Sequence, residues 1–147
     1  MSKAIRVFSV ALACVLMLSL FACSKGEKKA ASKEFSAIAG NWIADKAHAL
    51  GHTYVDRSSD EPKIHTLTDE EMDGTKIQIG TDGSLKFESL GKSFSGTLKL
   101  YQADSNWFDL TLSGESTATG TVRLDGDKLN FDLRTDTMTY SLIAVKA

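Results

Sequence analysis

The amino-acid sequence predicts an all-β protein, an antiparallel meander of about eight to ten strands for which a small closed barrel is favoured. Apolar and polar residues alternate in seven successive runs after residue 75, as in sheets that bury one face and expose the other. Two of the short links, at Asp82-Gly83 and Asp125-Gly126, are dipeptides that favour tight hairpins. Because a long open sheet exposes unpaired edges, closure is expected. A two-sheet sandwich is the alternative, since periodicity does not register closure.

The seven alternating runs carry an apolar residue at every second position. They cover residues 75–80, 84–89, 94–101, 107–112, 118–124, 128–133 and 138–145. Gly96 and Gly120 interrupt the apolar face in the middle of their runs. This predicts either sharp coiling of the barrel wall or close packing at those two points.

Upstream of the meander, the sequence predicts three further strands and one helical turn. The strands are expected at 39–45, 52–55 and 63–67, and the first of them would close the barrel. Thr68 and Glu71 have the spacing of a capping box, which predicts the helical turn within 67–74.

Residues 1–22 have the pattern of a secretory signal peptide. Lys3 and Arg6 form a short basic region, and residues 7–22 are nearly all apolar. A spanning helix needs roughly 20 apolar residues, and this run is shorter. A cleaved signal is therefore favoured, with a retained membrane helix as the alternative.

The residues at the end of this run, Leu20-Phe21-Ala22-Cys23, resemble the lipobox of bacterial lipoproteins. The resemblance implies that Cys23 receives a diacylglycerol, that cleavage occurs before it, and that the lipid holds the protein to the cell envelope. Cys14 is a competing site after a shorter apolar run. If cleavage precedes Cys23, the mature chain has no second cysteine and no disulfide. Ser24 follows the expected lipid site, and a serine there is compatible with location of the lipoprotein in the outer membrane if the host has two membranes. In a host with one membrane, the protein would lie at the cell surface.

The remainder divides into a flexible lipidated tether at 23–34 and one domain at 35–147. The tether contains four lysines among small residues and has no hydrophobic period. In the domain 17 Asp and Glu outnumber 11 Lys and Arg by six. This acidic balance argues against nucleic acid as a partner, because phosphate binding needs a basic face.

Gly40-Asn41-Trp42, at the start of the first expected strand, resembles the opening signature of lipocalins and related calycin barrels. The resemblance implies that Trp42 closes one end of the barrel beneath an arginine from the far end of the chain. Arg134 is the nearest match to that arginine. A second lipocalin motif, Thr-Asp-Tyr between later strands, is not evident. The alternative interpretation is a core tryptophan that follows a loop glycine.

Candidate residues for chemistry are few. His48, His52 and His65 fall close together, which makes a metal-binding protein one alternative, and polar loop residues are the other interpretation. Gly51 interrupts any helix that would align the first two. No convergent nucleophile, base and electrophile set is recognisable, so we expect neither catalysis nor a cofactor.

Tyr101 and Trp107 point away from the apolar face of their strands and form a possible recognition surface, with Tyr54 as a further member. The expected role is therefore a non-catalytic one. The protein would be an envelope lipoprotein that binds a small apolar ligand in the barrel or another envelope protein at its rim. An interaction or inhibitor protein with a filled barrel is the alternative.

Overall fold

The computed structural model describes residues 33–147. The predicted signal at 1–22, Cys23 and the tether as far as residue 32 lie outside the described residues. Within the described part, no helix has the length and apolar character of a membrane span.

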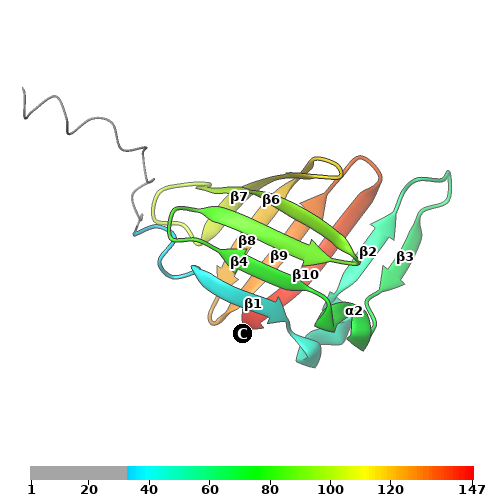
Figure 1. Ribbon diagram of the computed structural model, residues 1–147, viewed down its shortest axis with the longest axis horizontal. Helices are drawn as coiled ribbons and strands as arrows, with labels where there is room; N and C mark the ends of the chain where they lie inside the picture. The colour runs from blue at the N-terminus through cyan, green and yellow to red at the C-terminus, as the bar shows by residue number, and fades with distance from the viewer. Residues whose placement is uncertain (1–32) are drawn as a thin grey trace, which may run out of the picture. The chain divides into compact units, whose positions relative to one another are not determined.

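Ten strands make up one antiparallel sheet, and eight of them close into a barrel (Figure 1). The barrel strands are β1 (Gly40–Ala44), β4 (Lys76–Ile79), β5 (Ser84–Ser89), β6 (Lys92–Leu100), β7 (Trp107–Gly114), β8 (Ala118–Asp125), β9 (Lys128–Arg134) and β10 (Met138–Lys146). Pairing between β1 and β10 completes the ring. The prediction of an all-β barrel is confirmed, and this closure decides against the sandwich.

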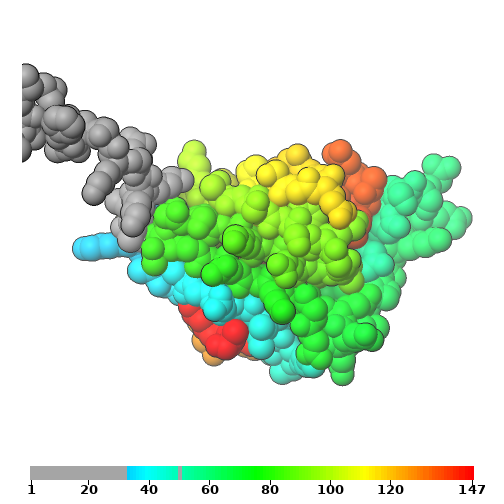
Figure 2. All heavy atoms as spheres, in the orientation of Figure 1, coloured from blue at the N-terminus to red at the C-terminus, as the bar shows by residue number. Residues whose placement is uncertain are grey.

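The other two strands, β2 (Thr53–Asp56) and β3 (Lys63–Thr66), form a hairpin outside the ring. β1 pairs with the last residues of β10, and β2 pairs with its first residues along the same edge. A 3-10 helix, η2 (Lys46–Gly51), separates β1 from β2 along the chain. The hairpin consequently leaves the barrel wall at one end, where it stands out from the body of the molecule (Figure 2).

A short helix, α2 (Asp69–Asp73), connects the hairpin to β4. The Thr68 side chain accepts a hydrogen bond from the Glu71 N–H, and the Glu71 carboxylate accepts one from the Thr68 N–H. The predicted capping box is therefore confirmed, and it fixes both the start of α2 and the direction of the Glu71 side chain.

The barrel interior is packed with apolar side chains. Along the eight barrel strands the buried residues fall at alternate positions, as the alternation predicts. The Phe87 ring lies at the centre, with centroids 6.4 Å from the rings of Phe94, Phe131 and Tyr140. Space for a ligand has therefore to be sought at the barrel ends.

Gly96 and Gly120 lie where neighbouring strands approach most closely. A Cβ atom at Gly96 would be 1.9 Å from the Thr111 carbonyl oxygen, and one at Gly120 would be 1.9 Å from the Asp132 carbonyl oxygen. Of the two alternatives expected at these positions, the structure shows close packing, because only glycine leaves room for the adjacent backbone.

One end of the barrel is closed by the turn at 33–38. Ile38 is fully buried, and the Phe35 ring packs 5.8 Å from the Phe108 ring. Trp42 is also buried and donates its indole N–H to the Ile38 carbonyl oxygen at 2.8 Å. Gly40 has a φ of 128°, a conformation that glycine adopts readily, so the Gly-x-Trp spacing has a physical basis.

The cation above Trp42 comes from Lys146 and not from Arg134. The Lys146 ammonium lies 4.5 Å from the centre of the indole and donates a hydrogen bond to the Ala39 carbonyl oxygen. Arg134 ends β9 and pairs with Thr139 near the start of β10, at the opposite end of the barrel. The register of the closing β1–β10 pair decides this, because it places Lys146 beside Trp42.

Candidate functional site

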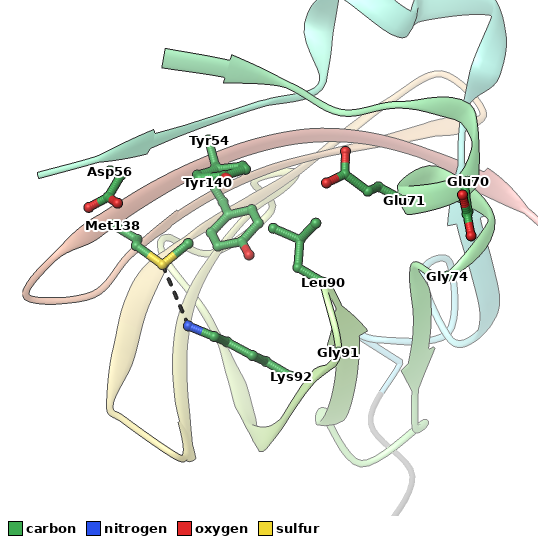
Figure 3. A pocket seen from close by; sticks show the side chains of 10 residues that line it. All are labelled: Tyr54, Asp56, Glu70, Glu71, Gly74, Leu90, Gly91, Lys92, Met138 and Tyr140. Atoms are coloured by element: carbon green, nitrogen blue, oxygen red, sulfur yellow. Dashed lines mark hydrogen bonds between the residues drawn. The ribbon is translucent and has the colours of Figure 1, made fainter. Parts of the chain in front are cut away.

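A pocket of about 610 Å³ lies at the open end of the barrel, which we call the mouth pocket (Figure 3). Its walls come from β2, α2, the turn between β5 and β6, and the start of β10. They consist of Tyr54, Asp56, Glu70, Glu71, Gly74, Leu90, Gly91, Lys92, Met138 and Tyr140. The volume lies within the range of roughly 300–1,000 Å³ that is usual for small-molecule sites.

Tyr140 is the most buried of the residues that line this pocket. Only 4% of its surface is exposed, and its hydroxyl has no hydrogen-bond partner within residues 33–147. Burial, together with the negative charge of Glu71, raises the pKa of Tyr140 to about 12, so the group is a protonated donor at neutral pH. Its ring packs 5.8 Å from Tyr54, which in turn packs 4.8 Å from His65.

Lys92 supplies the only cationic side chain among the residues that line the pocket. It is half-buried at the start of β6, and its ammonium lies 3.7 Å from the Met138 sulfur (Figure 3). Within residues 33–147 it forms no salt bridge. A thioether is a weak acceptor, so most of the hydrogen-bonding capacity of this ammonium is unused by the protein.

Two of the pocket carboxylates are already bound by the protein itself. Asp56 accepts a hydrogen bond from the Ser58 N–H at 2.8 Å, which lowers its pKa. Glu71 accepts from the Thr68 N–H and contacts the His65 imidazole at 2.9 Å, and these two bonds lower its pKa as well. Asp56 and Glu71 are therefore engaged by groups of the protein, whereas the Tyr140 hydroxyl has no partner within residues 33–147.

Leu90 lies at the tip of the turn between β5 and β6, next to the Tyr140 ring (Figure 3). It has a φ of 53° and is followed by Gly91 with a φ of 71°. A left-handed conformation costs a residue with a side chain about 1–2 kcal/mol. The tip of this turn is Leu90-Gly91, and Lys92 begins β6. The structure thus accepts backbone strain at the point where Leu90 borders the pocket.

The three histidines considered as metal ligands, His48, His52 and His65, each have different hydrogen-bond partners. His48 lies 2.8 Å from an Asp45 carboxylate oxygen, which also accepts from the Lys128 ammonium at 2.9 Å. Bonding to Lys128 lowers the pKa of Asp45 to about 2. His65 lies with Glu71, and no group of three or more potential metal ligands occurs within residues 33–147. The geometry gives the metal-binding alternative no support.

His52 is fully buried and connects the hairpin to the barrel. Its Nε2 lies 2.9 Å from the Ile143 carbonyl oxygen, and its Nδ1 lies 2.7 Å from the Met72 sulfur. Burial lowers the pKa of His52, because a charged imidazole would lose its hydration there. This neutral side chain helps to hold β2 and α2 against β10.

The predicted recognition residues Tyr101 and Trp107 lie together on the outer face at the closed end. Their ring centroids are 6.1 Å apart, and the Arg123 guanidinium is 5.9 Å from the Trp107 ring. Tyr101 is 61% exposed and Trp107 is 41% exposed. Tyr54 does not join them, since it belongs to the mouth pocket.

Several mouth-pocket residues were not singled out from the sequence. Leu90 and Lys92 lie nearly 50 residues before Met138 and Tyr140 in the chain, and the two pairs line one pocket only in the closed barrel. Two signals were present: a tyrosine hydroxyl on an otherwise apolar strand face, and a leucine before glycine at a hairpin tip, where Asn or Asp is usual.

The fold and the pocket define a class: a closed, eight-stranded antiparallel β-barrel, compatible with a lipocalin-like architecture, that carries a small-molecule-sized pocket at its open end. Comparison with known proteins yielded no match to any protein-family model, to curated proteins or to solved structures.

Proposed function

We propose that this protein is a lipid-anchored envelope lipoprotein of lipocalin-like architecture that binds a small, largely apolar molecule in the mouth pocket. The observation that carries the binding role is the unpaired, buried Tyr140 hydroxyl in a pocket of ligand size. Buried polar groups without a partner are rare in folded proteins, and a ligand that accepts from this hydroxyl explains its presence.

The composition of the pocket supports a binding role without catalysis. Leu90, Met138 and the Tyr54 ring contribute apolar surface. The residues that line the pocket include no serine, threonine, cysteine or histidine, so the lining offers no hydroxyl or thiol nucleophile paired with an imidazole base. We therefore place the ligand at the mouth, outside the packed barrel interior.

Native mass spectrometry of the protein purified from its own host tests the binding role. We expect a co-purifying mass of a few hundred daltons, lost in a Gly91→Trp variant that fills the mouth. Gly126→Trp is the matched control, because Gly126 also lies in a hairpin turn with positive φ and has open space around it. Protein that carries no small molecule in any preparation would contradict the role.

The lipid anchor rests on the lipobox-like residues that end at Cys23. Replacing Cys23→Ala is expected to leave the chain unprocessed or to release it from the membrane fraction, whereas Cys14→Ala should change neither property. Normal processing and membrane fractionation of the Cys23 variant would refute lipidation at this position.

A second candidate function is the recognition of another envelope protein by Tyr101 and Trp107. The observation in its favour is the exposed aromatic pair with the Arg123 guanidinium against it, since aromatic residues and arginine are enriched at interface hot spots. Cross-linking in the host should then capture one partner that Trp107→Ala loses and that Lys99→Ala, on the outer face of β6, retains. Identical cross-linking in both variants would exclude this surface.

A further inference from the structure

The mouth pocket lacks an acceptor for two of its donors. The Tyr140 hydroxyl has no partner, and the Lys92 ammonium contacts only a thioether within residues 33–147. Both residues line the mouth pocket, Tyr140 from β10 and Lys92 from β6 (Figure 3). A ligand with a hydrogen-bond acceptor placed between these two donors would satisfy both of them.

The charge of that acceptor follows from the pair of donors. A buried hydroxyl and an unpaired ammonium bind an anionic oxygen more strongly than a neutral one, because charge-assisted hydrogen bonds are roughly twice as strong as neutral ones. Within residues 33–147 neither donor is hydrogen-bonded to a pocket carboxylate, and Asp56 and Glu71 accept from the Ser58 and Thr68 N–H groups instead.

The same carboxylates limit how much negative charge the pocket accepts. Asp56, Glu70 and Glu71 border the space and only Lys92 opposes them, so these carboxylates repel every negative charge on a ligand and repel a dianion more strongly than a monoanion. A phosphate or other dianion is disfavoured for this reason. The apolar surface of Leu90, Met138 and Tyr54 favours a ligand with a hydrocarbon body.

We propose that the mouth pocket binds a monocarboxylic acid with an apolar body, whose carboxylate accepts hydrogen bonds from the Lys92 ammonium and the Tyr140 hydroxyl. This inference rests on the proposed binding function and names the chemical class of its ligand. The hydroxyl oxygen is buried in the structure, so the ligand reaches it as side chains that border the pocket move aside.

Calorimetric titration of the full-length protein at pH 7.5 tests the proposal with two acids and their uncharged amides. The pairs are 1-naphthylacetate with 1-naphthylacetamide, and octanoate with octanamide. Within each pair the apolar body is constant and only the negative charge is removed. We expect each acid to bind roughly tenfold or more tightly than its amide, the ratio typical of one hydrogen bond to a charged group.

Two variants and two controls test whether the preference for the acid over its amide arises in the mouth pocket. Lys92→Met and Tyr140→Phe should each weaken acid binding by roughly tenfold and leave amide binding within about twofold. Lys99→Met and Tyr101→Phe remove the same groups from exposed positions and should change neither. A merely structural role of Lys92 or Tyr140 would weaken acid and amide together.

The outcomes separate this inference from the broader function. Equal binding of acid and amide, or acid binding unaffected by Lys92→Met and Tyr140→Phe, would overturn the carboxylate assignment and leave a binding role intact. Failure of both acids to bind at millimolar concentration would also overturn it. The binding role itself fails only if the host-purified protein carries no small molecule.

Discussion

Replacing Gly96 or Gly120 with alanine should destabilise the barrel more than any other single-methyl addition in the described residues. Each glycine lies in mid-strand on the inner face, with the carbonyl oxygen of the neighbouring strand where a Cβ atom would be. The separation of 1.9 Å compares with a minimum of 3.0 Å for real Cβ contacts, so the two strands would have to separate by about 1.1 Å.

The expected loss in the free energy of unfolding follows from the interactions that such a displacement of the strands would break. Overpacking by one methyl group costs about 1–3 kcal/mol when side chains can adjust, but here the obstacle is backbone. Moving the strands apart also weakens adjacent ladder hydrogen bonds, each worth about 1 kcal/mol. We therefore expect a loss of roughly 3 kcal/mol or more in the free energy of unfolding, out of about 5–15 kcal/mol for a typical domain.

Urea unfolding followed by far-UV circular dichroism measures this loss. Gly74→Ala is the matched control, because Gly74 has a right-handed helical conformation and its Cβ would meet only backbone oxygens at 3.6 Å or more. This variant should unfold within about 0.5 kcal/mol of the wild type. If Gly96→Ala and Gly120→Ala did the same, the close strand approach described at these two positions would be wrong.

Three further predictions follow from single buried groups. Tyr140→Phe should raise the free energy of unfolding of the ligand-free protein by about 1 kcal/mol, because it removes an unpaired buried hydroxyl, while Tyr101→Phe should change nothing measurable in the same urea titration. His52 has a lowered pKa, so the unfolded chain binds more protons below its ordinary value of 6.5, and stability should decrease as the pH falls from 7.5 towards 5.5. The slope from this residue is at most about 1.4 kcal/mol per pH unit and should be absent in His52→Gln; a slope that persists in this variant would contradict the assignment. Lys146→Met should lower the free energy of unfolding by about 1 kcal/mol by removing the cation from the Trp42 ring, whereas Arg134→Met should have little effect. A larger loss in Arg134→Met than in Lys146→Met would instead support the arginine expected from the lipocalin resemblance.

Much of the fold could be predicted because strand signals are local. The alternation in the runs that became β4 to β10 specifies which side chains face inward, whatever the strands pair with. The hairpin glycines Gly83 and Gly126 have positive φ values, as the Asp-Gly pairs predicted, because that conformation is a property of the dipeptide. The Thr68 and Glu71 capping box is equally local.

The site was less accessible to prediction, because it depends on which distant residues are brought together. His48, His52 and His65 are neighbours in sequence, yet each has a different partner in the structure. Tyr101 and Trp107, in contrast, flank a single hairpin, so their proximity could be anticipated from the chain itself.

The sequence by itself determined the strands, their inward faces, the tight turns and the two positions where only glycine fits. Only the tertiary structure decided that β1 and β2 share one edge of β10, which opens the mouth pocket between Lys92 and Tyr140 and sets Lys146 over Trp42. The physical reason is that backbone preference and hydrophobic period act over a few residues. Strand register and closure depend instead on contacts between residues up to about a hundred positions apart.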